Sequence, residues 1–223
     1  MGPLLSVAIF SKSRWRETML KLWGRANSIN VQKPLYCIEE LGLPYERIDA
    51  GRGYGIVDTA EYKAMNPNGL VPTLEDGDFV LWESNVIVRY LCARHSDGDL
   101  WPHDLRLRAA ADRWMDWQQT AITPAIGTAF HGLVRMPGSR TPQDIDESAA
   151  KTDALFLILD AHLAGRTWLE GDRFSMAECV IAPTVHRWLN MPVQHSDIPH
   201  VRRFYERVMS RPAAQRVMTL PIT

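Results

Sequence analysis

The chain has 223 residues, of which 46% are hydrophobic and 23% are charged, enough for one large domain or two small ones with buried cores. Its 25 basic and 26 acidic residues give a formal net charge of −1, and no basic cluster suggests a nucleic-acid surface. No stretch approaches the roughly 20 apolar residues of a membrane-spanning helix. We therefore expect neither a nucleic acid nor a membrane as a partner.

Residues 1–18 do not follow the pattern of a secretion signal. The apolar segment "LLSVAIF" is short, and the basic segment "SKSRWRE" comes after it. A signal peptide has the opposite order, with basic residues first and a small-residue cleavage site last. We interpret residues 1–18 as an N-terminal extension or a mis-assigned translation start, assign them no function, and expect the first strand to follow Met19.

Residues 19–95 alternate between strand and helix patterns. Gly42 marks the end of the first helix, Pro34 is expected in its first turn, and Asp76-Gly77 indicates a hairpin turn. The predicted elements, in chain order, are a strand at 20–23, a helix at 30–41, a strand at 45–49, a hairpin of 73–74 with 79–81, and a helix at 84–94. This order, β-α-β followed by β-β-α, predicts a small mixed sheet with helices packed on it.

A polar, turn-rich linker at 96–103 precedes a region, 104–223, that has no strand signal. Ser175 and Glu178 form a capping box, and Phe174 with Cys179 forms the accompanying hydrophobic staple, so a helix is expected to begin there. Helices are predicted at 104–121, 144–164, 175–190 and 199–210, with a short one from Pro212. The chain is therefore predicted to be an α/β domain followed by an all-helical domain.

The three cysteines, Cys37, Cys92 and Cys179, are far apart in the sequence and form no C-x-x-C motif. They match neither a disulfide framework nor a zinc site, and unpaired thiols suit a reducing cytoplasm. We predict three buried thiols that act as small hydrophobic side chains, no metal, and a cytoplasmic location.

The segment "NGLVPTLEDGDFVLWES" at 68–84 places Pro72 beside a predicted strand, although proline cannot donate a hydrogen bond to a sheet. A cis peptide bond before Pro72 would turn the chain and point the N–H and C=O of Val71 outward. An extended peptide could then pair with these two groups as a short antiparallel strand. The segment is therefore predicted to bind a peptide-like ligand.

Glu83 and Ser84 lie at the start of the next predicted helix. The free N–H groups and the dipole at a helix start favour a carboxylate, the Ser84 hydroxyl adds a donor, and the Glu83 carboxylate could bind an ammonium. Together these groups would hold a zwitterionic amino-acid head beside a peptide-like segment. Glutathione, whose γ-glutamyl group is an amino acid in form, matches this description.

Several motifs together resemble the cytosolic glutathione transferase family, in particular its bacterial serine- or asparagine-type members. The motifs are "LWGRANSINVQK", "AGRGYGI", "NPNGLVPTL" followed by "LWESNVIVRYL", and "RWMDW", and the resemblance covers about residues 19–220. It implies a thioredoxin-like N-terminal domain with a four-stranded mixed sheet, an all-helical C-terminal domain, and a homodimer. It also implies an enzyme that takes glutathione as co-substrate, uses no metal, and directs the glutathione thiolate at a small electrophile.

The resemblance places the catalytic group after the first strand, at Ser28 or at the neighbouring Asn27. A free thiol has a pKa of about 8.5, and lowering it by one unit takes about 1.4 kcal/mol, which one charge-assisted hydrogen bond to the thiolate can supply. The alternative is that Asn27 and Ser28 only cap the helix, which is a common role of these residue types.

The same resemblance assigns glutathione binding to Leu70, Val71, Pro72, Glu83 and Ser84. Family members often place a lysine just before the Val-Pro step, where this chain has Gly69 and Leu70. Arg52 is the best substitute for binding the glycine carboxylate, with Tyr54 as a weaker candidate; the alternative is that Arg52 is a solvated loop arginine. Asn30 could reach the same pocket or cap the helix.

The second substrate is expected between the α/β domain and the first two helices of the helical domain, where residues 130–138 are expected to end an interrupted helix. Arg135 could anchor an anionic electrophile such as a small halo-acid there, or it could be a surface arginine. Trp114 and Trp117 are expected in the core or at the domain interface rather than in the substrate wall. The sequence does not separate conjugation, dehalogenation and peroxide reduction, and a non-catalytic binding or regulatory protein of the same fold is the alternative to an enzyme.

Overall fold

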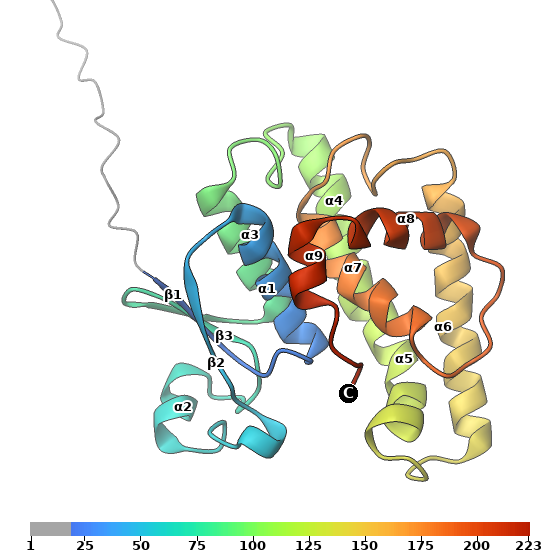
Figure 1. Ribbon diagram of the computed structural model, residues 1–223, viewed down its shortest axis with the longest axis horizontal. Helices are drawn as coiled ribbons and strands as arrows, with labels where there is room; N and C mark the ends of the chain where they lie inside the picture. The colour runs from blue at the N-terminus through green and yellow to red at the C-terminus, as the bar shows by residue number, and fades with distance from the viewer. Residues whose placement is uncertain (1–18) are drawn as a thin grey trace, which may run out of the picture.

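The computed structural model describes residues 19–223, so the proposed extension at 1–18 lies outside the described residues. Figure 1 shows a sheet on one side, a bundle of helices on the other, and helices α1 (Ile29–Leu41) and α3 (Ser84–His95) between them. Buried apolar side chains of α1, α3 and the central helix α7 (Met176–Leu189) belong to one continuous core. The predicted fold class, a thioredoxin-like α/β domain followed by an all-helical domain, is confirmed.

Within residues 19–223 the sheet has four short strands in the order β2-β1-β3-β4. Strand β1 (Leu20–Trp23) is parallel to β2 (Tyr45–Ile48), whereas β3 (Thr73–Asp76) is antiparallel to both β1 and β4 (Phe79–Trp82). A parallel pair needs a crossover, which α1 supplies, and the tight turn at Gly77, with a φ of 66°, joins the antiparallel pair. The predicted mixed sheet and hairpin are confirmed.

Helix α1 ends at Gly42, as predicted. The φ of Gly42 is 63°, and its N–H bonds to carbonyls of the last helical turn. The expected place of Pro34 is wrong, because the helix begins at Ile29 and puts Pro34 in the second turn. Proline has no N–H, so Pro34 cannot donate to the carbonyl of Asn30.

Two short elements between β2 and β3 are absent from the sequence prediction. They are the single 3-10 turn η1 (Arg52–Tyr54) and helix α2 (Ala60–Met65). Both are too short to show a periodic apolar pattern, and α2 buries Tyr62 alone of its residues. Figure 1 shows α2 apart from α1 and α3, beside the lower end of the sheet.

The helical domain starts with one long helix that runs from 105 to 135, not from 104 to 121 as predicted. Pro124 does not end this helix, because a π-helical turn shifts the backbone hydrogen bonds just before it. The parts of the long helix are α4 (Leu105–Trp117), the π-helical turn η2 (Gln118–Ile122), α5 (Thr123–Phe130) and the π-helical turn η3 (His131–Arg135). The later helices match the prediction within two residues and are α6 (Pro142–Leu163), α7, α8 (Pro199–Met209) and α9 (Pro212–Val217). None of the helices between residues 19 and 223 has the length and apolar character that a membrane crossing requires.

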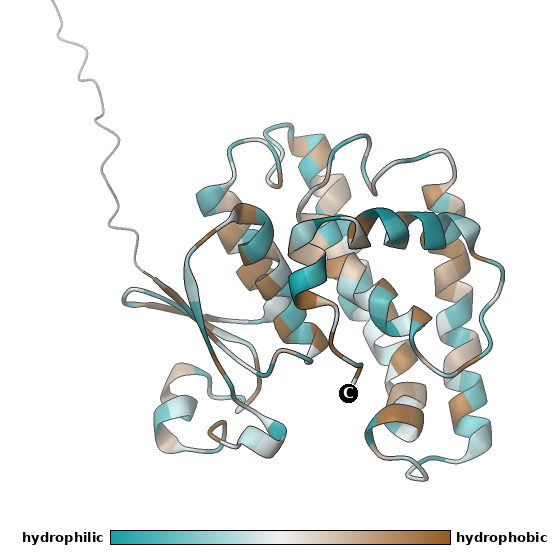
Figure 2. Ribbon diagram, in the orientation of Figure 1, coloured by the Kyte–Doolittle hydropathy of each residue, from teal (hydrophilic) through white to brown (hydrophobic). Residues whose placement is uncertain are grey.

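Helix α7 is buried on all sides from Met176 to Trp188. A helix in this position has to be apolar around most of its circumference, which explains the run "MAECVIAPTV". The outer helix α8, by contrast, carries hydrophilic residues along its outward side (Figure 2).

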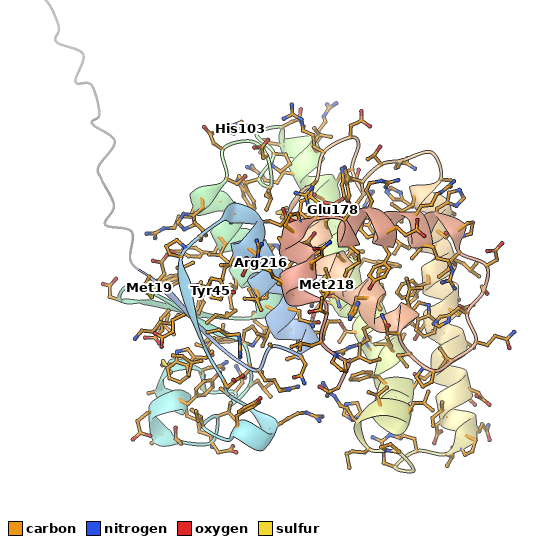
Figure 3. All side chains as sticks on the ribbon, in the orientation of Figure 1. Met19, Tyr45, His103, Glu178, Arg216 and Met218 are labelled. Carbon is orange, nitrogen blue, oxygen red and sulfur yellow. The ribbon has the colours of Figure 1, made fainter. Side chains whose placement is uncertain are left out.

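The predicted capping box at the start of α7 is confirmed. The Glu178 carboxylate accepts from the N–H and the hydroxyl of Ser175, both at 2.7 Å, and from the N–H of Leu169, also at 2.7 Å. The Ser175 hydroxyl in turn accepts from the N–H of Ala177 at 3.3 Å. Glu178 therefore ties the loop before α7 to the start of the helix, inside the core (Figure 3).

The end of the chain is fastened to α1. Arg211 forms a two-point ion pair with Glu40, at 2.6 and 2.7 Å, and Arg216 donates to Glu39 at 2.5 Å. Figure 3 shows Arg216 beside α1. These contacts anchor the helical domain to the helix that follows β1.

The three cysteines are distant in sequence but meet in the core, from α1, α3 and α7. The sulfur atoms of Cys37 and Cys92 are 3.4 Å apart, and all three thiols are free and buried, as predicted. Burial raises the pKa of the Cys37 thiol and raises the pKa of Cys179 to about 11. Across the described residues, no three or more His, Cys, Asp or Glu side chains form a group that could hold a metal ion.

Candidate functional site

A cavity of about 150 Å³ opens beside the start of α3. The predicted site residues that line it are Asn30, Leu70, Val71, Pro72, Glu83 and Ser84, and Asn66, Asn68, Trp82 and Gln119 complete its wall. The structure therefore brings together the residues to which the sequence assigns glutathione binding, except Arg52.

The peptide bond between Val71 and Pro72 is cis, as predicted. Val71 lies just outside β3, and within residues 19–223 neither its N–H nor its C=O has a hydrogen-bond partner. An extended peptide in the cavity would find one backbone donor and one backbone acceptor on the same residue.

A buried hydrogen-bond network holds the segment before Val71. The Leu70 carbonyl accepts from the Tyr62 hydroxyl at 2.8 Å and from the Asn66 amide at 2.9 Å, and both side chains also contact the Thr73 hydroxyl. Because these partners occupy the Leu70 carbonyl, they fix the loop and leave the Val71 backbone free. The sequence analysis missed both Tyr62 and Asn66; the signal that could have found Asn66 is its place in the "NPNG" motif.

Gly24 lets this segment approach the loop that follows β1. The φ of Gly24 is 146°, and a Cβ atom at this position would lie 2.4 Å from a methyl group of Val31 and 3.2 Å from the Cβ of Val71. Any larger residue would therefore push Val71 away from the start of α1, where the predicted catalytic residues lie.

Ser84 and Glu83 form the end of the cavity at α3. Ser84 is a buried residue that is only 5% exposed, and its hydroxyl has no hydrogen-bond partner among residues 19–223. The first backbone bond of the helix runs from the N–H of Ile87 to the carbonyl of Glu83, so the N–H groups of the first turn are free. Glu83 has a φ of 75°, which is strained for a residue with a side chain, and its carboxylate is exposed.

A second cavity, of about 170 Å³, shares Asn30 with the first. It lies between α1, the long helix and α7, and both π-helical turns contribute to its wall, a placement that is frequent at functional sites. Its lining residues include Ser28, Asn30, Phe130, His131, Arg135 and Arg187. The structure thus places the predicted Arg135 in a cavity next to the predicted glutathione site.

Ser28 lines the second cavity, and Asn27 precedes it in the chain without lining either cavity. Ser28 is the N-cap residue of α1, but its side chain makes no capping hydrogen bond, and it lines the second cavity. The carbonyl oxygen of the Asn27 side chain is buried and has no hydrogen-bond partner among the described residues. Asn30 is inside the helix and caps nothing. Helix capping by the side chain, the alternative role of Asn27, Ser28 and Asn30, is not observed.

Comparisons with known proteins agree with this geometry. Two family models match the chain, "Glutathione S-transferase, N-terminal domain" over residues 18–93 and "Glutathione S-transferase, C-terminal domain" over residues 122–212. Among curated proteins, "Glutathione S-transferase GstB" from Escherichia coli (strain K12) is 44% identical over 208 residues, which are 92% of this chain and 100% of that protein. The chain belongs to the glutathione S-transferase family.

Solved structures extend this likeness. The theta class glutathione S-transferase from the citrus canker pathogen Xanthomonas axonopodis pv. citri, with glutathione bound, has a TM-score of 0.88 and 40% identity, and the match covers 92% of this chain and 99% of that chain. A more distant curated relative, "Disulfide-bond oxidoreductase YfcG" from Escherichia coli (strain K12), is 28% identical over 85% of this chain and 90% of that protein. The protein is therefore a glutathione transferase, and we do not retain the alternative of a non-catalytic protein of the same fold.

Trp114 and Trp117 of the transferase lie outside both cavities, as expected. Their rings pack edge to face with centroids 5.1 Å apart. The indole N–H of Trp114 donates to the Glu170 carboxylate at 2.7 Å. Both residues belong to the helical domain's own packing and do not contribute to a substrate wall.

Arg135 and Arg187 line the second cavity of the transferase, and Arg25 and Arg52 lie near them, so the region is strongly positive. Burial, followed by the charges of the other arginines, lowers the pKa of Arg187 to about 9 and that of Arg135 to about 10. In the described part of the chain, none of the four forms an ion pair with a carboxylate. Arg52 is exposed and belongs to this group, and it does not line the cavity beside Ser84. The sequence analysis missed Arg187.

Lys33 links helix α3, next to the first cavity, to the π-helical turn η2 beside the second cavity. Its side chain is fully buried, and its Nζ donates to the Asn85 side chain at 3.1 Å and to the Gln118 side chain at 2.7 Å. Asn85 follows Ser84 in α3, and Gln118 begins the π-helical turn η2. Burial, and secondly the charge of Arg187, lowers the pKa of Lys33 to about 7. The side-chain oxygens of Asn85 and Gln118 are two acceptors, which is the number that the two N–H groups of a neutral amine need. A protonated amine has three N–H groups and would need a third acceptor.

This lysine is expected to make the stability of the transferase depend on pH. Between about pH 7 and its ordinary pKa of 10.5, Lys33 holds its proton in the unfolded chain but not in the folded one. The free energy of unfolding therefore rises with pH in this window, by up to about 1.4 kcal/mol per pH unit from this group. Urea unfolding of the wild type and of Lys33→Met at about pH 7 and about pH 9 measures this contribution, because the variant lacks it.

Lys151→Met, on the exposed side of α6, is the matched control, and its stability should follow the wild type at both pH values. If the stabilities of Lys33→Met and the wild type change in parallel, Lys33 keeps its proton in the folded protein.

Proposed function

We propose that this transferase binds glutathione in the cavity beside Pro72 and directs the thiolate at a small electrophile in the adjoining cavity. The observation that carries this proposal is that the two cavities meet at Asn30, with the free Val71 backbone on one side and Ser28 on the other. One tripeptide can therefore be held along its backbone while its sulfur reaches the second cavity.

The γ-glutamyl end of glutathione is assigned to Ser84 and Glu83. Its carboxylate would accept from the Ser84 hydroxyl and from the free N–H groups of the first turn of α3. The Glu83 carboxylate, exposed at the same point, would bind the ammonium group. Ser84 lines the cavity, and its hydroxyl has no partner in the described residues, which supports this assignment.

The rest of the tripeptide follows from this first assignment. The cysteinyl backbone would pair with the N–H and C=O of Val71, between Leu70 and Pro72, and Asn30 would face the peptide from α1. Arg52 is assigned to the glycine carboxylate. The positive charges around Arg52 support this assignment, although Arg52 does not line the first cavity.

Asn27 or Ser28 is assigned to the thiolate, which makes the enzyme a serine- or asparagine-type member of its family. Neither side chain can act as a general base, but a hydrogen-bond donor aimed at the sulfur favours the charged form. The nearby arginines favour it further, because positive charge lowers the pKa of a thiol.

The proposed reaction is nucleophilic attack by this thiolate on a small electrophile. In conjugation or dehalogenation, a carbon–sulfur bond forms and the leaving group departs with its electron pair; peroxide reduction starts from the same thiolate. We further propose a homodimer in the cytoplasm. Exposed apolar side chains on β4 and α3, Phe79, Trp82 and Val86, support a partner surface, and three free thiols suit a reducing compartment.

The thiolate assignment is tested by replacing each of the two candidates. The ultraviolet absorbance of enzyme-bound glutathione thiolate is followed against pH for the wild type, Asn27→Ala and Ser28→Ala. The residue that holds the sulfur is expected to raise the bound thiol pKa by about one unit, or about 1.4 kcal/mol, when it is removed. Ser210→Ala, at the exposed end of α8, is the control for a serine far from both cavities. If neither active-site variant shifts the titration, both residues are structural and this assignment is wrong.

A further inference from the structure

We infer that the electrophile of this transferase carries a small anionic group, such as a carboxylate, which Arg135 and Arg187 bind in the second cavity. This inference rests on the proposed function and goes beyond it, because it names the class of the second substrate. It starts from two cations that the rest of the molecule leaves without a counter-charge.

Arg187 is the deepest of the charged residues in this cavity. It lies in the last turn of the buried helix α7, its side chain lines the cavity, and the residue is only 7% exposed. Its guanidinium lies over the Phe130 ring, 3.9 Å from the ring centroid, and has no hydrogen bond or ion pair within residues 19–223. A buried charge without a partner is strongly unfavourable, so such a residue is expected where a ligand supplies the opposite charge.

Arg135 approaches the same ring from the π-helical turn η3. Its guanidinium is 4.9 Å from the Phe130 centroid, and one of its nitrogens is 3.2 Å from the Nε2 of His131. Its Nε atom is buried and has no partner in the described part of the chain. Two arginines from different elements therefore lie against the same ring in the cavity wall, with donors still unused.

No acidic side chain among the residues that line this cavity balances these charges. Arg25 and Arg52 stand close enough to lower the pKa of both Arg135 and Arg187, so they add to the repulsion. In the proposed complex, the two glutathione carboxylates are bound at Ser84 and Arg52. Arg135 and Arg187 bring two positive charges to the cavity, and the thiolate brings one negative charge. An anionic electrophile supplies the second negative charge.

The size and chemistry of the cavity narrow the class further. About 170 Å³ admits a short chain, and Ile122, Ile126 and Phe130 give it apolar walls beside the two arginines. A short carboxylic acid with a halide on the carbon next to the carboxylate fits this description. The thiolate electron pair forms the carbon–sulfur bond, the carbon–halogen bond breaks, the halide leaves with its pair, and the carboxylate stays on the product.

The arginines would also supply a catalytic advantage for such a substrate. A thiolate and a carboxylate repel each other, so an anionic halo-acid reacts slowly with glutathione in water. Guanidinium groups that bind the carboxylate remove this repulsion as the two reactants approach. A neutral electrophile of the same size is not repelled by the thiolate, so the arginines are expected to accelerate its reaction less.

The test compares two substrates that differ only in charge, chloroacetate and chloroacetamide. Chloride release with glutathione is measured for each, and the enzymatic rate is divided by the spontaneous rate. The wild type is expected to accelerate the acid at least tenfold more than the amide. Arg135→Met and Arg187→Met should each lower this acid-to-amide ratio at least tenfold, whereas Arg187→Lys should keep part of it.

Arg202→Met, on the exposed side of α8, is the matched control and should leave the ratio at the wild-type value. Arg187 is buried, and its methionine variant could fail to fold, so a second measurement uses the wild type alone. Inhibition by propionate is compared with inhibition by propionamide, and propionate should inhibit at least tenfold more strongly.

Three results would overturn the inference: a wild-type preference for the amide, an acid-to-amide ratio that survives in Arg135→Met and in folded Arg187→Met, or equal inhibition by propionate and propionamide. If the amide is accelerated and the acid is not, the inference alone is wrong. If neither is accelerated and bound glutathione shows no lowered thiol pKa, the proposed function is wrong as well.

Discussion

Replacing Ser84 with alanine is expected to raise the glutathione concentration for half-maximal rate about tenfold or more, with a much smaller change in the maximal rate. A hydrogen bond to a charged group contributes roughly 1.5 to 3 kcal/mol, and each 1.4 kcal/mol is a factor of ten in affinity. Ser84 is proposed to bind a carboxylate that does not react. Its contribution is therefore the same in the ground state and the transition state, and its loss appears in KM.

Steady-state rates against glutathione concentration at a fixed, saturating electrophile measure this effect. Ser84→Thr is the matched control, because it keeps a hydroxyl at the start of α3 and should recover most of the affinity. An unchanged KM in Ser84→Ala would show that the γ-glutamyl carboxylate does not bind at α3, and with it the orientation proposed for the whole tripeptide would fail.

Replacing Glu178 with alanine is expected to lower the free energy of unfolding by on the order of 3 to 5 kcal/mol, the largest stability effect that we expect in the helical domain. The variant would leave the N–H of Leu169 and both donors of Ser175 without their acceptor inside the core. Each buried donor without a partner costs about 1 to 3 kcal/mol, and the lost cap adds about 1 kcal/mol.

Urea unfolding of Glu178→Ala, Glu178→Gln and the wild type measures this difference. Glu178→Gln keeps an acceptor and should lose less. Glu206→Ala, on the exposed side of α8, is the control and should stay within about 0.5 kcal/mol of the wild type. A loss below about 1 kcal/mol in Glu178→Ala would mean that water or other groups replace the carboxylate.

The parts of the fold that could be predicted from the sequence are those with local signals. The end of α1 at Gly42, the hairpin at Gly77 and the capping box at Ser175 all depend on residues within one turn of each other. Helix α2 has six residues and is held by distant contacts of Tyr62, so its own sequence contains little information about it. The predicted helix at 104–121 is too short because the chain continues as a helix through Pro124, a residue type that usually ends one, and a π-helical turn just before it makes this possible.

The candidate site divides in the same way. Val71, Pro72, Glu83 and Ser84 are close in sequence and their roles follow from backbone geometry, so the sequence analysis could place them in one cavity. Arg187 and Lys33 acquire their roles only through the packing of α7, α1 and η2 against one another. The one local sign of such a role is a charged residue among the apolar residues of a helix that is predicted to be buried. A buried charge is unusual unless it has a partner.

The buried cysteines have a consequence for an enzyme that is proposed to act on alkylating compounds. A compound that reacts with the sulfur of glutathione can also react with a protein thiol and inactivate the catalyst permanently. All three cysteines of the chain are 0% exposed, and burial keeps the thiols of Cys37 and Cys179 protonated by raising their pKa. The fold therefore offers such compounds no accessible thiol of its own, and we expect turnover to continue in their presence without alkylation of cysteine.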